Sequence, residues 1–107
     1  MVTINGETWY IKLVSPFHPA LLKNSFDYAL GVCDDELKTI FINNSLTNDY
    51  TWKVLCHELT HAAMFSYNVF LDISQEEMVA DLIATYGAEI VYETNKIFKR
   101  IKEKRGT

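Results

Sequence analysis

The sequence of 107 residues predicts an α+β fold, in which a small N-terminal antiparallel β-sheet of hairpins packs on two long helices. Two observations support this prediction. Short stretches with alternating apolar residues, separated by turn signals, occupy residues 1–43. Two long segments with a helical apolar period follow them. The length suits one domain and no repeat or linker divides it, so residues 1–107 are predicted to form a single domain.

The strands are predicted from turn residues and from alternation. In VTINGETWYIKLV, Asn5-Gly6 is a hairpin turn between two short strands. Pro19 favours a short helix in the segment that follows. A second hairpin is expected from strand 28–33 to strand 37–43, around an acidic turn at Asp34-Asp35-Glu36.

The two helices are predicted from capping residues and apolar spacing. Thr47 or Asn48 can cap a helix that runs to about Tyr67. Ser74 is expected to open a second helix that reaches about Lys102. This second helix has an apolar stripe, and its small residues at a spacing of four would let another helix approach closely. The stripe is Val79, Leu82, Ile83, Tyr86, Ile90, Ile97, Phe98 and Ile101, and the small residues are Ala80, Ala84 and Ala88.

Composition bears on compartment and partners. No apolar run could span a membrane and the N-terminus has no secretory signal, so the protein is expected in the cytoplasm, with Cys33 and Cys56 as free thiols. Residues 1–95 carry thirteen acidic and four basic side chains, whereas residues 96–107 carry one acidic and six basic. A solvated helix end explains the basic segment better than a patch for nucleic acid or an acidic partner, because no aromatic interleaving or known nucleic-acid-binding module accompanies it.

The segment VLCHELTHAAMF, residues 54–65, carries the strongest functional signal. His57 and His61 lie four residues apart on one helix face, where two imidazoles can reach a single metal ion. Glu58 lies beside the first histidine and can act on a water rather than bind the metal. The competing explanation is a chance pair on an amphipathic helix. It is disfavoured because the chain has three histidines in all and because apolar flanks would bury this pair, which then needs partners.

A catalytic zinc site takes three protein ligands, so a carboxylate should complete this one. Glu77 on the second helix is the preferred ligand, with Asp81 one turn further accepting a hydrogen bond from a ligand histidine. Ser74 and Glu77 also match the capping-box pattern S-x-x-E, which would occupy Glu77. In that case Glu76 or Asp81 becomes the third ligand, and Glu89 is a more distant option.

A peptidase also needs a hydrogen-bond donor for the oxyanion of its tetrahedral intermediate, and the pattern does not select one. His18, Tyr67 and Tyr86 are the candidates. The competing interpretation is a surface loop histidine for His18 and a core or interface position for either tyrosine.

HELTHA, residues 57–62, followed by EEMVAD, residues 76–81, resembles the zincin superfamily in its gluzincin arrangement. The hairpin leading into this helix is similar to compact ImmA/IrrE-like metallopeptidases, common in phages and mobile elements, over residues 28–90. The resemblance implies a minimal zincin-like core with one Zn²⁺ ion on His57, His61 and Glu77, and Glu58 as general base. It also implies that strand Leu37–Asn43 is a sheet edge on which an extended peptide or protein substrate docks.

The function predicted from these residues is a zinc-dependent metallopeptidase. The alternative is a catalytically inactive zincin-fold module with a binding or regulatory role, in which Cys33 or His18 completes a structural zinc site. A hydrolase that acts on nucleic acid through residues 96–107 is the least favoured interpretation.

Overall fold

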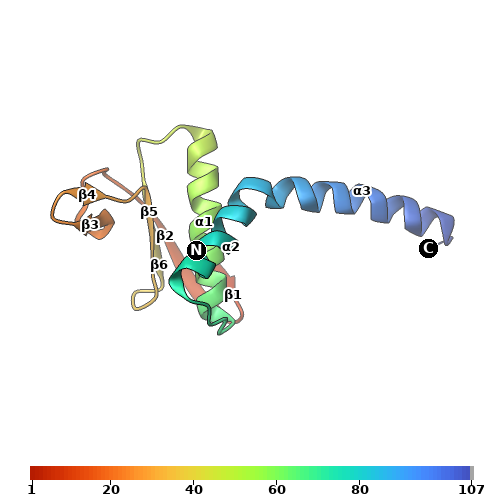
Figure 1. The fold of residues 1–107 in the computed structure, drawn as a ribbon, viewed down its shortest axis with the longest axis horizontal. Helices are drawn as coiled ribbons and strands as arrows, with labels where there is room; N and C mark the ends of the chain where they lie inside the picture. Colours follow the sequence, from red (N-terminus) through yellow and green to blue (C-terminus); the bar gives the residue numbers. More distant parts are fainter. Residues whose placement is uncertain (107) are drawn as a thin grey trace.

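The computed structural model describes residues 1–106 and confirms the α+β class: a small mixed sheet is followed by two long helical segments (Figure 1). The second segment is continuous from Ile73 to Lys104 through α2, η2 and α3. In chain order the elements are β1 (Val2–Ile4), β2 (Glu7–Val14), the 3-10 helix η1 (Pro19–Leu21), β3 (Leu22–Asn24), β4 (Asp27–Tyr28), β5 (Gly31–Asp34), β6 (Thr39–Asn43), α1 (Asn48–Ser66), α2 (Ile73–Leu82), the π-helix η2 (Ile83–Gly87) and α3 (Ala88–Lys104).

Both predicted hairpins are present. The turn between β1 and β2 has positive φ at Asn5 (48°) and Gly6 (80°), the conformation that a two-residue turn between twisted strands requires. β5 and β6 form the second hairpin, with an antiparallel register that runs from Gly31 opposite Ile42 to Asp34 opposite Thr39. In the turn of this hairpin, Asp34 Oδ1 accepts from the Leu37 N–H at 3.0 Å, so local turn chemistry supports both pairs.

The prediction of a wholly antiparallel sheet is wrong at its centre. The main sheet has the order β1-β2-β6-β5, and β2 runs parallel to β6. The direction of that pair depends on how residues 15–38 cross between the strands, which alternation within one strand does not encode. The same order places β6 inside the sheet, so the prediction that Leu37–Asn43 is an edge is also wrong. The edges of this sheet are β1 and β5.

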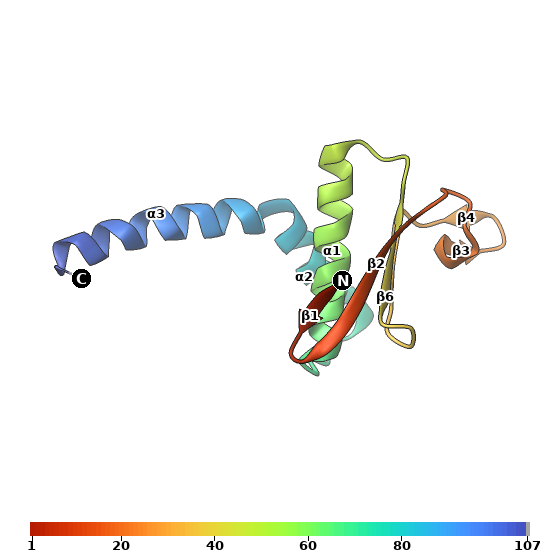
Figure 2. The same ribbon diagram turned by 180° about the vertical axis from the view of Figure 1, so that it is seen from behind.

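The core lies between the sheet and α1, which covers one face of it (Figure 2). Trp9 of β2 and Ile40 of β6 are fully buried there against Ala62 of α1. The indole Nε1–H of Trp9 donates to Ser66 Oγ at 2.8 Å, and this hydrogen bond ties β2 to the last residue of α1. The core thus fixes the rotation of α1, and with it the face on which the histidines lie.

Helix caps decide which acidic side chains are available to a site. Thr47 caps α1 as predicted, accepting from the Tyr50 N–H. The predicted capping box at Ser74 and Glu77 is wrong, because Asp72 caps α2. Asp72 Oδ1 accepts from the Gln75 N–H at 2.8 Å, and the Gln75 side chain reaches back to the Asp72 N–H. Glu77 is therefore free of any capping role.

Only the first part of the second helical segment packs on the body. Ala80 and Ala84 are buried, but Ala88 is exposed, and α3 has no buried residue. The π-helical turn η2 separates α2 from α3, which projects away from the body (Figure 1). The apolar residues predicted on α3 therefore do not contribute to the core. Within residues 1–106, no helix has both the length and the hydrophobicity needed to cross a membrane.

Replacing Ser66 by alanine is expected to lower the free energy of unfolding by about 1–3 kcal/mol, because the buried indole N–H of Trp9 loses its acceptor. Chemical denaturation followed by circular dichroism measures the change. Ser25→Ala removes an exposed hydroxyl from the turn between β3 and β4 and should change the same free energy by less than about 0.5 kcal/mol. Equal stability of Ser66→Ala and the wild type would contradict the role of this hydrogen bond.

Candidate metal centre

The two histidines of α1 point toward one carboxylate on α2. His57 Nε2 lies 3.1 Å from Glu77 Oε2, and His61 Nε2 lies 2.9 Å from Glu77 Oε1. The two Nε2 atoms are 3.1 Å apart. One ligand atom from each of the three side chains falls within 4.8 Å of the other two, so His57, His61 and Glu77 could hold a metal ion together.

The opposite nitrogen of each imidazole has its own carboxylate partner. His57 Nδ1 lies 3.0 Å from Asp81 Oδ1, and His61 Nδ1 lies 2.6 Å from Glu76 Oε1. These carboxylates accept only when each neutral ring carries its proton on Nδ1. The unprotonated Nε2 atoms of both rings then face each other and the two Glu77 oxygens. All four atoms are hydrogen-bond acceptors, and none of them carries a proton that it could donate to the others. A cation is the group that such a donor set fits.

Glu76 and Asp81 therefore lie behind the histidines rather than beside Glu77. The contact of Asp81 with His57 is the kind of contact that the sequence analysis expected. The contact of Glu76 with His61 was not expected, because Glu76 was weighed there only as a ligand. The sequence does contain a signal for it: Glu77 and Asp81 share one face of a helix and Glu76 flanks that face, so all three carboxylates can reach the facing helix.

Close approach of the two helices depends on small residues. Ala80 lies between the carboxylates on α2 and is fully buried, and Ala84, one turn further along in η2, is buried as well. Larger side chains at these positions would separate the helices. The distance from the imidazoles to Glu77 is therefore set by packing as well as by charge.

Glu58 is 6 % exposed and lies between α1 and strand β5. A Cβ added to Gly31 would come within 2.6 Å of Val54 Cγ1 and 3.1 Å of Glu58 Cγ, so only glycine lets β5 pass this close to the helix. Burial raises the pKa of the Glu58 carboxyl, an effect that the nearby His61 and His57 oppose. No motif in the sequence marks Gly31 as part of the site.

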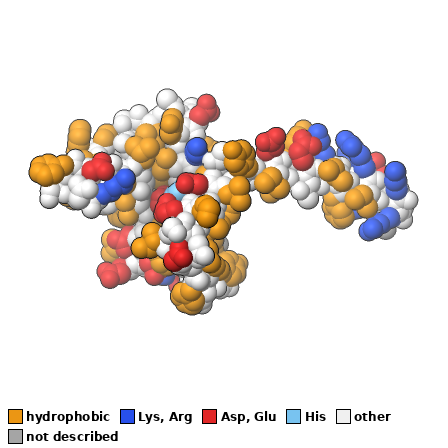
Figure 3. All heavy atoms as spheres, in the orientation of Figure 1, with side chains coloured by type: hydrophobic (Ala, Val, Ile, Leu, Met, Phe, Trp, Pro, Cys, Tyr) orange, Lys and Arg blue, Asp and Glu red, His pale blue; other side chains and the backbone are white. Residues whose placement is uncertain are grey.

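A cleft of about 530 Å³ opens beside the histidines. One wall is formed by His57, Glu58 and Glu77, and the other by the start of β5 and the residue before it, Gly31 and Leu30. An adjoining hollow of about 440 Å³ continues past Glu58 to Cys33 and Phe65. Figure 3 shows a pale blue histidine surface among red acidic side chains near the middle of the body. The centre is thus open to solvent and lies next to an edge of the sheet.

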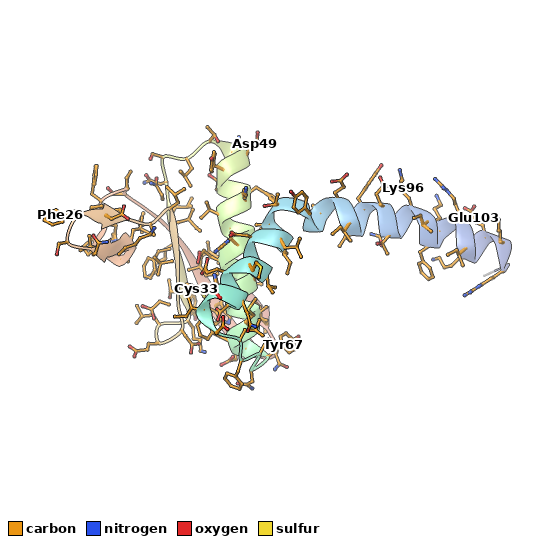
Figure 4. The ribbon with its side chains drawn as sticks, viewed as in Figure 1. Phe26, Cys33, Asp49, Tyr67, Lys96 and Glu103 are labelled. Atoms are coloured by element: carbon orange, nitrogen blue, oxygen red, sulfur yellow. The ribbon has the colours of Figure 1, made fainter. Side chains whose placement is uncertain are left out.

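Several residues considered in the sequence analysis lie elsewhere. His18 Nδ1 accepts from the Ala20 N–H, and its ring stacks on Phe41. Tyr67 is the exposed residue that ends α1 (Figure 4), and Tyr86 is exposed in η2. Among the residues that the structure describes, neither Cys33 nor His18 belongs to the ligand group.

Two histidines and a glutamate that could hold a metal ion, with a further glutamate next to the first histidine, form an arrangement typical of metal-dependent peptidases. The model of the peptidase M78 family, described as the IrrE N-terminal-like domain, matches residues 20–97, and the chain belongs to this family. The resemblance noted in the sequence is thereby confirmed. Comparison with curated proteins and with solved structures gave no match.

Glu77→Ala is expected to abolish tight binding of one divalent ion per chain, because it removes a ligand. Glu76→Ala and Asp81→Ala are expected to weaken binding about 10–100-fold, because each leaves the ligands but frees one imidazole. Competition with a chromogenic chelator measures the affinity of each variant for zinc, and elemental analysis measures the number of zinc ions bound per chain.

Glu89→Ala removes an exposed acid of α3 and is the matched control, with wild-type affinity expected. Tight binding retained in Glu77→Ala, or complete loss in Glu76→Ala alone, would contradict the assignment of ligands.

Proposed function

We propose that this member of the peptidase M78 family is a zinc-dependent peptidase that hydrolyses peptide bonds in a protein or peptide substrate. The observation that carries the proposal is the convergence of His57, His61 and Glu77 beside the buried carboxylate of Glu58. A structural site would need only the ligands. Hydrolysis also requires a general base, and the largely buried Glu58, which lines the open cleft, can supply it.

Zinc is the proposed ion because two imidazole nitrogens and one carboxylate form a donor set of the size and type found in catalytic zinc sites. Bound there, it would act as a Lewis acid on the scissile carbonyl and lower the pKa of a water molecule. Asp81 and Glu76 hold His57 and His61 in the tautomer that presents Nε2 to the ion.

Glu58 is the proposed general base. Its carboxylate takes a proton from the attacking water and passes it to the amine nitrogen of the leaving peptide. Gly31 keeps β5 against the Glu58 side chain and so limits its freedom to turn away. Burial makes the carboxyl a stronger base than an exposed glutamate, which suits an acceptor that must later return the proton.

Substrate docking is proposed on β5, the edge strand next to the cleft. The carbonyl of Leu30 accepts from the Asn43 N–H, so alternate residues of β5 bond to β6. The backbone groups of Gly31 and Cys33 then face away from β6, toward the free edge. An extended peptide could add there as a further strand, which would bring its backbone past Glu58.

The second candidate is a binding or regulatory module in which the ion has a structural role. One observation favours it: none of the three oxyanion donors considered in the sequence, His18, Tyr67 and Tyr86, lines the cleft. Tyr50, Lys23 and Lys53 do line it and are the donors within reach of a bound peptide. Activity measurements on the metal-loaded chain separate the two candidates.

Glu58→Gln is expected to lower the rate of peptide cleavage by at least about 10²-fold, because the amide cannot accept the water proton. Zinc content and thermal stability should stay close to those of the wild type, since Glu58 is not a ligand. The assay is mass spectrometry of a peptide mixture incubated with zinc-loaded protein.

Glu89→Gln makes the same chemical change at an exposed position of α3 and should cleave like the wild type. Cleavage by Glu58→Gln at the wild-type rate would remove Glu58 from the mechanism. Cleavage by neither protein, with zinc bound to both, would favour the module without catalytic activity.

A further inference from the structure

Every residue of α3 is exposed, although the helix carries a row of large apolar side chains. Ile90, Val91, Ile97, Phe98 and Ile101 are each at least 39 % exposed. Their spacings of one, three, four and six residues place all five within one stripe along the helix. A stripe of this size on a projecting helix is characteristic of an interaction surface.

Charges are distributed unevenly along one flank of this stripe. Glu89 and Glu93 occupy the half nearer the body, whereas Arg100 and Lys104 occupy the far half of the same flank. Figure 3 shows the same separation, with red side chains near the start of α3 and blue side chains toward its end. A helix with this pattern is complementary to a copy of itself that runs in the opposite direction.

We propose that α3 pairs with α3 of a second copy of this chain, antiparallel and about a two-fold axis near residues 96 and 97. The apolar stripes face each other in this arrangement. Ile90 of one copy packs against Ile101 of the other, and Val91 packs against Phe98 of the other. Two-fold symmetry makes each of these contacts twice.

The charged flank selects this same register. Glu93 of one copy lies opposite Arg100 of the other, and Glu89 lies opposite Lys104. In a parallel pair, each residue would instead lie near the same residue of the other copy, which places glutamate near glutamate and arginine near arginine. Electrostatics therefore favours the antiparallel direction in both halves of the interface.

Self-pairing also accounts for the charge division of the whole chain. The basic side chains of the second half of α3 would lie along the acidic first half of the partner helix, in addition to contacts within the same helix such as that of Lys96 with Glu93. Neither the ligands of the metal centre nor Glu58 belongs to α3, so this surface is independent of the proposed peptidase activity.

The test is sedimentation equilibrium of the full chain over a range of micromolar concentrations. The wild type is expected to reach twice the monomer mass, and Ile97→Asp is expected to stay monomeric. Arg100→Glu and Glu93→Arg should each weaken dimerisation at least tenfold, and the double variant Glu93→Arg/Arg100→Glu should restore it, because the pair is reversed.

Lys99→Glu is the matched control: it makes the same charge change on the opposite face of α3 and should dimerise like the wild type. Because α3 has no buried residue, these variants should keep the circular dichroism and zinc affinity of the wild type.

A wild type that stays monomeric at all concentrations would overturn the proposal. So would a dimer that Ile97→Asp leaves intact, or a double variant that stays monomeric. A monomeric chain that binds vesicles of anionic lipid or duplex DNA through residues 96–106 would assign the stripe to that partner instead.

Discussion

The meeting of two imidazoles on α1 with one carboxylate on α2 is the constraint on which this structure depends. Four acceptor atoms converge there, and two further carboxylates direct them from behind. Such a cluster of like polarity is unfavourable without a cation, so other features of the fold keep it together. Asp72 starts α2 and leaves Glu77 free, Ala80 permits close contact, and the core anchors α1 at Trp9.

The sequence predicted what depends on neighbours along the chain. Asn5-Gly6 specified one hairpin, Thr47 specified the start of α1, and the spacing of His57 and His61 placed both rings on one face. Prediction from the sequence failed for features that depend on contacts or boundaries not encoded by neighbouring residues. β6 pairs in parallel with β2, which places β5 and not β6 at an edge of the sheet. The N-cap of α2 is Asp72, two residues before the predicted Ser74, so Glu77 faces the histidines instead of capping the helix.

Apolar periodicity predicted a helix correctly but not its partner. The stripe that includes Ile97 and Phe98 has the spacing of a core-facing surface, yet η2 directs it away from the sheet. Apolar residues repeating every 3.6 positions indicate that one face of the helix is apolar, but they do not identify what packs on that face. The charge order along that face carries the additional information that points to a second copy. The proposed peptidase site and the proposed dimer contact thus lie on separate parts of the chain.

Zinc K-edge X-ray absorption of the zinc-loaded chain tests the central claim most directly, because it reports the ligands themselves. Two imidazole nitrogens are expected at about 2.0–2.1 Å from the zinc, with oxygen in the remaining positions. A sulfur neighbour at about 2.3 Å would instead place Cys33 or Cys56 on the ion. That result, or a shell with a single imidazole, would contradict a centre built from His57, His61 and Glu77.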